Sequence, residues 1–135
     1  MFKNILIPVA LDHQADLDKT IAIARVLQRD GGKITVVGVV EDIPGYVAEY
    51  VTVRPSTKIQ QAIRGRLQMA VDGQDGIDVE VVTGKPGVAI AEMAEKTKAD
   101  LIVIRSRRPG IEDYFLGSTA SRVVRRSPCA VMVLR

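Results

Sequence analysis

The sequence predicts an α/β protein in which a parallel β-sheet lies between two layers of helices. Three observations lead to this fold class. Segments typical of buried strands alternate with segments of helical periodicity along the chain. Most of the strands are continuous runs rich in β-branched residues, as in parallel sheets covered on both faces. The length of 135 residues suits one domain, which we expect to span residues 1–135.

The first part of the chain supplies two strands with a helix between them. Residues 2–9 (FKNILIPV) form a short apolar run that predicts a buried strand. Residues 15–29 carry apolar side chains at helical spacing, and the Asp30-Gly31-Gly32 triplet is typical of a turn that ends a helix. Residues 33–40 (KITVVGVV) predict a second buried strand.

The middle of the chain predicts a loop, a helix and a strand. Residues 41–55 show no periodicity and contain proline and glycine, which favours a loop. From Ser56 or Thr57 to Ala70, apolar residues recur at helical spacing. Residues 77–82 (IDVEVV) alternate apolar and polar side chains, so we expect a strand at an edge of the sheet.

The last third of the chain repeats the alternation twice. We expect a helix over about residues 87–97, with Pro86 near its first turn, and then a strand over residues 101–104 (LIVI). An arginine-rich loop leads to a helix over about residues 117–126, and residues 130–134 (AVMVL) form the last strand. This order predicts five parallel strands joined by right-handed crossovers.

Composition excludes several classes of function. No apolar run approaches the roughly 18–20 residues that span a bilayer, and the N-terminus does not resemble a signal peptide. We therefore expect a cytoplasmic protein with no membrane association. Cys129 and His13 are the single cysteine and histidine, which argues against a disulfide framework and against a cysteine- or histidine-built metal site.

Positive charge is concentrated near the C-terminus. The chain has a net charge of +3, yet residues 105–126 alone contain six arginines and two acids. The remainder of the chain is therefore slightly acidic. This pattern suits a local anion better than a nucleic acid, for which aromatic residues, at 4%, are also scarce.

The predicted fold indicates where a ligand would bind. In open α/β sheets, ligands bind beyond the carboxyl ends of the strands, close to the point where strand order reverses. The most apolar strands, residues 2–9 and 101–104, are expected at the centre of the sheet. The loops that follow them, residues 10–16 and 105–116, should therefore lie close together.

The Gly117-Ser118-Thr119 triplet opens a predicted helix and suits an anion. Free N–H groups and the helix dipole favour negative charge there, and Arg107 and Arg108 could add charge-assisted contacts. The alternative interpretation is an ordinary helix start with Ser118 as its N-cap.

The whole chain resembles the universal stress protein family. ILIPVALD resembles the end of that family's first strand, and residues 99–135 resemble its C-terminal pattern of strand, loop, Gly-Ser, helix and Ser-Pro-Cys. The resemblance implies a sheet of the adenine nucleotide α-hydrolase type with strand order 3-2-1-4-5, and a homodimer in many cases. It also implies ATP or AMP binding in many members, with Mg²⁺ accompanying ATP.

The chain departs from the nucleotide-binding pattern at two positions. Ala10 stands where the family's Pro-Val-Asp has its acid, although Asp12 lies two residues further on. Arg105 replaces the first glycine of the phosphate loop. Because an unpaired ligand donor costs about 1–3 kcal/mol, we expect binding to be weakened or altered. The Ser106-Arg107-Arg108-Pro109 string is similar to a bacterial subgroup with a Ser-His-Arg-Pro loop, some of whose members bind nucleotides.

The leading hypothesis is a cytoplasmic stress-response regulator that binds an adenine nucleotide. Its candidate binding residues are Pro8, Val9, Ala10, Asp12, Val39, Ile104, Arg105, Ser106, Arg107, Arg108, Gly110, Gly117, Ser118 and Thr119. The alternative is a dimeric interaction module without nucleotide, whose arginine-rich loop contacts a protein partner. We expect at most weak ATP hydrolysis, because the sequence offers no evident nucleophile–base pair. The apolar strand 130–134 is the expected dimer contact.

Overall fold

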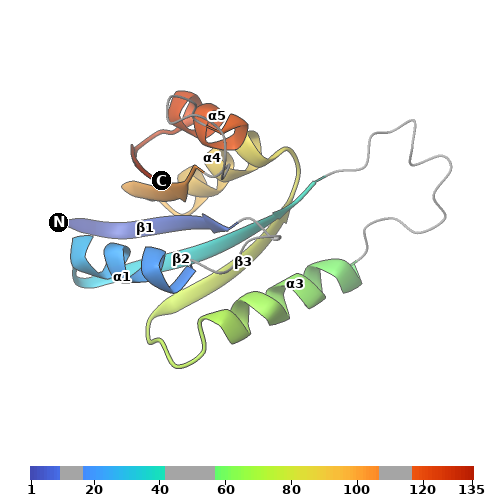
Figure 1. Cartoon of the computed structure of the whole chain (residues 1–135), viewed down its shortest axis with the longest axis horizontal. Coiled ribbons are helices and arrows are strands. Elements are labelled where there is room, and N and C mark those ends of the chain that lie inside the picture. Colours follow the sequence, from blue (N-terminus) through green and yellow to red (C-terminus); the bar gives the residue numbers. More distant parts are fainter. Residues whose placement is uncertain (10–16, 42–56, 107–116) are drawn as a thin grey trace, which may run out of the picture.

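The described strands form one five-stranded parallel sheet in the order β3-β2-β1-β4-β5, as the sequence and the family resemblance predict (Figure 1). The computed structural model describes residues 1–9, 17–41, 57–106 and 117–135. Its elements are β1 (Phe2–Val9), α1 (Leu17–Leu27), β2 (Gln28–Val40), α3 (Thr57–Ala70), β3 (Ile77–Thr83), α4 (Pro86–Lys96), β4 (Leu101–Arg105), α5 (Ser118–Arg126) and β5 (Ala130–Leu134).

Helices cover both faces of this sheet, with α1 and α3 on one face and α4 and α5 on the other (Figure 1). Side chains of the central strands alternate between the two cores. Leu101 and Val103 of β4 belong to the core under α1 and α3, whereas Ile102 and Ile104 belong to the core under α4 and α5. Successive residues at the end of β4 therefore serve opposite faces.

The boundary between α1 and β2 differs from the sequence-based expectation. The helix ends at Leu27, and strand structure begins at Gln28, which pairs with Phe2 of β1. The Asp30–Gly32 triplet thus lies within β2 and not in a separate turn. Its glycine Gly31 adopts φ +75°, and the β1–β2 register shifts between Phe2 and Asn4, so the extra residues form an irregularity in the strand.

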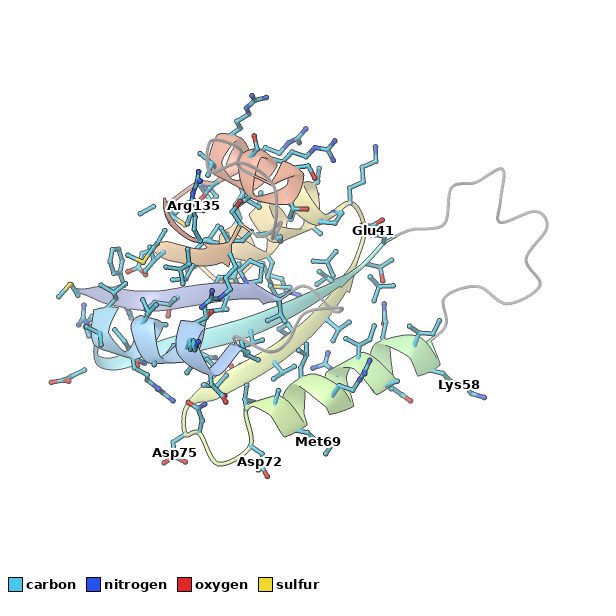
Figure 2. All side chains as sticks on the ribbon, viewed as in Figure 1. Glu41, Lys58, Met69, Asp72, Asp75 and Arg135 are labelled. Atoms are coloured by element: carbon cyan, nitrogen blue, oxygen red, sulfur yellow. The ribbon has the colours of Figure 1, made fainter. Side chains whose placement is uncertain are left out.

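The two edge strands have different surroundings. β3 alternates buried residues with half-buried or exposed ones, in line with its sequence pattern, and α3 packs along it. Figure 2 shows Lys58 and Met69 of α3 pointing away from the sheet. β5 pairs with β4 along its whole length, from Leu101↔Ala130 to Arg105↔Leu134. The order of the described strands places nothing on its other side.

A hydrogen-bond network joins β1 and β4 at their amino ends. The Asp100 carboxylate accepts the backbone N–H groups of Lys3 (2.8 Å) and Asn4 (2.9 Å), and the Asp100 N–H donates to the Asn4 carbonyl (2.9 Å). The Asn4 side-chain amide donates to the carbonyls of Thr97 (3.4 Å) and Lys98 (3.2 Å). Both side-chain and backbone hydrogen bonds therefore hold residues 97–100, which lead into β4, to the start of β1.

Candidate functional site

Strands β1 and β4 are neighbours in the sheet, and we call the line along which they meet the β1–β4 seam. Near their carboxyl ends the two strands are not paired with each other. The register of the seam covers only Ile5↔Leu101 and Leu6↔Ile102, although β1 continues to Val9 and β4 to Arg105. The outer neighbours stay paired to the same level, at Val9↔Gly38 and Arg105↔Leu134. Pro8 contributes to the gap because proline has no N–H to donate. Strand order reverses at this seam, which is where open α/β sheets bind ligands.

Helix α5 begins next to the end of β4. Its N-cap is Gly117, with no side-chain cap, and its first helical residue is Ser118. The alternative interpretation of Ser118 as the N-cap is therefore wrong. The first backbone bond within the helix runs from Ser121 N–H to the Gly117 carbonyl, at 2.8 Å. By helix geometry, the N–H groups of residues 118–120 have no intrahelical acceptor, so an anion placed there would find donors.

Ser106 connects β4 to the start of α5. Its hydroxyl oxygen accepts the Gly117 N–H at 2.8 Å, while its own N–H donates to the Leu134 carbonyl at 2.8 Å. A Cβ built on Gly117 would have only the Ser106 hydroxyl within 4 Å, at 3.5 Å, among the described residues. The backbone in front of α5 is therefore held in place and remains approachable.

The Arg105 side chain points to the face of the sheet opposite to that of Ser106. Its Nε donates to the hydroxyl of Thr20 on α1, at 2.8 Å, on the other face of the sheet from α5. The alternation along β4 explains this, because Ile104 and Ser106 serve the α5 face and Arg105 serves the α1 face. The arginine that replaces the first glycine of the phosphate loop does not lie over the start of α5.

The remaining candidate residues divide between the two faces. Val39 and Ile104 pack into the core under α4 and α5, whereas Val9 packs against the core under α1. Pro8 pairs with Val37 between them. The side chain of Ser118 is exposed and that of Thr119 is half-buried. Ala10, Asp12, Arg107, Arg108 and Gly110 lie outside the described residues.

Sequence reasoning missed Thr20, the partner of Arg105. Thr20 is 3% exposed and lies on the buried face of α1 with Leu17, Ile21 and Ala24. A polar residue within an otherwise apolar helical stripe was the available signal, since a buried hydroxyl needs a hydrogen-bond partner.

Among the described residues, no group of three or more His, Cys, Asp or Glu side chains could hold a metal ion. No described helix combines the length and the apolar character needed to cross a membrane.

Comparison with known sequences identifies one family along the whole chain. The profile of the Universal stress protein family matches residues 1–135. A universal stress protein encoded in the QAH/OAS sulfhydrylase 3'region of Thermus aquaticus is 33% identical, with full coverage of both chains. Universal stress protein G of Salmonella typhimurium is also 33% identical over both full lengths.

Solved structures share the fold. The hypothetical protein MJ0577 superposes with a TM-score of 0.77 at 19% identity and covers 99% of this chain and 96% of its own. A universal stress protein in complex with cAMP has a TM-score of 0.62 at 21% identity, with 99% and 97% coverage. A universal stress protein from Archaeoglobus fulgidus in complex with dAMP has a TM-score of 0.60 at 15% identity, with 98% coverage of both chains.

Proposed function

The chain belongs to the universal stress protein family, and we propose that it binds an adenine nucleotide, ATP or AMP, at the carboxyl ends of β1 and β4. The observation that carries the proposal is the unpaired end of the β1–β4 seam, which lies beside the uncapped start of α5. Structural neighbours in complex with cAMP and dAMP support the choice of adenine nucleotides.

In this proposal the phosphates lie against the first turn of α5. The free N–H groups there and the hydroxyl of Ser118 would donate to phosphate oxygens, and the helix dipole would favour their charge. Val39 and Pro8 would form the apolar surroundings of the adenine. Arg107 and Arg108 would add positive charge, and ATP would bring Mg²⁺ with it.

Arg105 acts at the other side of the seam. Because its Nε is engaged by Thr20 on α1, its bulk does not occupy the space in front of Gly117. The guanidinium contributes positive charge to the carboxyl edge of the sheet from the α1 side. The departure from glycine at this position is therefore compatible with nucleotide binding.

We assign the protein a regulatory role in a cytoplasmic stress response, in which the bound nucleotide sets its state. The sequence contains no evident nucleophile–base pair, and only weak ATP hydrolysis is expected. Turnover that disappears with Ser118→Ala would contradict the regulatory assignment and favour an enzyme.

Calorimetric titration with ATP and Mg²⁺, and separately with AMP, tests the site. We expect wild-type binding in about the micromolar range and a loss of at least about tenfold in Gly117→Val, whose side chain would stand in front of the α5 N–H groups. Gly65→Val on α3 is the matched control, because a Cβ at Gly65 meets nothing within 4 Å among the described residues. No heat with either nucleotide up to about millimolar concentration would favour the interaction-module alternative.

We also propose a homodimer formed through β5. This strand is an edge strand whose residues Val131–Leu134 are only half-buried, and an apolar edge favours pairing with a second copy. Light scattering after size-exclusion chromatography should give twice 14.7 kDa. Ala130→Lys, which adds charge at an exposed position of the strand, should shift the mass toward the monomer. A monomeric wild type at micromolar concentration would refute the dimer.

A further inference from the structure

Three arginines form a stripe along the outer face of α5. Two of these arginines, Arg125 and Arg126, follow Arg122 by three and four residues, so each lies on the same side of the helix as Arg122. Ala120 and Val123 are buried on the opposite side. All three arginines are exposed, and nitrogen-tipped side chains stand out from α5 into solvent in Figure 2.

The charges of this arginine stripe are not neutralised within the described chain. Among those residues, no ion pair or hydrogen bond involves the three guanidinium groups, whereas Lys33 pairs with Asp78 and Arg64 with Glu80 elsewhere. The helix dipole accounts for two basic residues in the last turn, but its influence falls off before Arg122. The stripe therefore has more positive charge than the helix end alone explains.

Arg122 is held at its stem by α4. A Cβ built on Gly87 would lie 2.6 Å from the Arg122 Cβ, 3.3 Å from its Cδ and 3.5 Å from its Cγ. The aliphatic part of the arginine thus lies directly on the first turn of α4, next to the exposed Lys85. A side chain restrained in this way loses less conformational entropy when its head group binds a partner.

The surroundings of the stripe restrict the kind of partner. α4, which packs beside α5, exposes Glu92 and Glu95 as well as Lys96, so these three side chains add no net positive charge to the stripe. A nucleic acid that continued from the stripe onto these side chains of α4 would meet carboxylates. Val124, 46% exposed, lies on the side of α5 that carries Ala120 and is not part of the stripe.

We propose that the arginine stripe of α5 docks an acidic segment of a partner protein, with carboxylates that pair with the guanidinium groups. Arginine suits this role because its planar fork accepts a carboxylate through two parallel hydrogen bonds. The surface follows the first turn of α5, which is the part of the helix proposed to hold the nucleotide. Binding of the partner does not depend on nucleotide.

Fluorescence anisotropy with a labelled acidic peptide tests the proposal in the absence of nucleotide. The probe is a peptide of about twelve residues that combines Glu with Leu, and its twin has Gln in place of every Glu. We expect the wild type to bind the Glu peptide at least about tenfold more tightly than the Gln twin at low salt, and the preference to shrink as salt is raised.

Matched charge reversals locate the binding. Arg122→Glu, Arg125→Glu and Arg126→Glu together should weaken binding by at least about tenfold. Lys19→Glu, Lys58→Glu and Arg66→Glu make the same change in net charge at exposed positions of α1 and α3, and should leave binding within about twofold. Equal losses in the two variants would overturn the proposal, because the attraction would then follow net charge alone.

Neutral variants and a nucleic-acid probe separate loss of binding from unfolding and an acidic peptide from a nucleic acid. If the reversal lowers the thermal unfolding temperature, Arg→Gln changes at the same three positions retain part of the stems and should still weaken binding. A single-stranded oligonucleotide of equal charge should bind more weakly than the Glu peptide. Tighter binding of the oligonucleotide would overturn the acidic-segment proposal in favour of nucleic acid.

Discussion

The two ends of the β1–β4 seam are built in opposite ways. At the amino end, the Asp100 and Asn4 side chains satisfy backbone groups of β1 and of the turn that precedes β4. At the carboxyl end, pairing stops after Leu6 and Ile102. There Arg105 bonds to Thr20 of α1, and Ser106 bonds to Gly117, the N-cap of α5, on the other face. The contrast indicates that the fold fixes β1 to the chain before β4 at the amino end and leaves the two strands unpaired at the end where a ligand is proposed.

The largest expected change in the free energy of unfolding comes from removing the Asp100 carboxylate at the amino end of the seam, which we call the closed end. Asp100→Ala leaves the N–H groups of Lys3 and Asn4 without their acceptor, so we expect the free energy of unfolding to fall by about 1–3 kcal/mol. Urea denaturation measures this loss, and Asp100→Asn, which keeps one acceptor oxygen, should lose less. A change near zero would mean that the amino end is not secured by this network.

A smaller effect is expected at the open end. Ser106→Ala removes the acceptor of the Gly117 N–H, and that group can turn to water because the start of α5 is partly exposed. We expect a loss of about 0.5–1.5 kcal/mol in the same urea experiment. A loss larger than that of Asp100→Ala would reverse the comparison between the two ends.

The smallest effect concerns an ion pair near the closed end. The Lys33 ammonium lies 2.6 Å from Asp78 on β3, and this hydrogen bond, with the Coulomb attraction of the carboxylate, raises the pKa of Lys33 above 10.5. A raised pKa stabilises the fold at pH values below 10.5 and loses that contribution as the pH rises through the folded-state value. Asp78→Asn should lower the pKa of Lys33 in an NMR titration, while stability at neutral pH hardly changes because both groups are exposed. An unchanged pKa would show that the pair does not form in solution.

Strand and helix patterns in the sequence were sufficient to predict a covered parallel sheet, and the family resemblance supplied its strand order. The continuous apolar run in β4 and the alternation in β3 predict a central and an edge position, and both are observed. The expected boundary between α1 and β2 was wrong. Gln28 pairs with Phe2, a contact between residues far apart in the sequence, and this pairing extends the strand through residues typical of a turn. Local propensity could not reveal it.

The candidate site was predictable only in outline. The family pattern pointed to the ends of β1 and β4, but not to the face on which each side chain lies. That information depends on strand register, which puts Arg105 against Thr20 and Ser106 against Gly117. The hydrogen bonds of Asp100 were not predicted for the same reason, since Asp100 and its partner Lys3 lie 97 residues apart in the sequence.

The close approach of Gly87 to Arg122 restricts how this sequence can change over evolutionary time. The nearest contact of a side chain at position 87 would be the Cβ of residue 122, an atom that every residue except glycine possesses. Shortening Arg122 to alanine would therefore not make room for Gly87→Ala. A side chain at position 87 is therefore excluded by the backbone spacing of α4 and α5, whichever residue other than glycine stands at position 122.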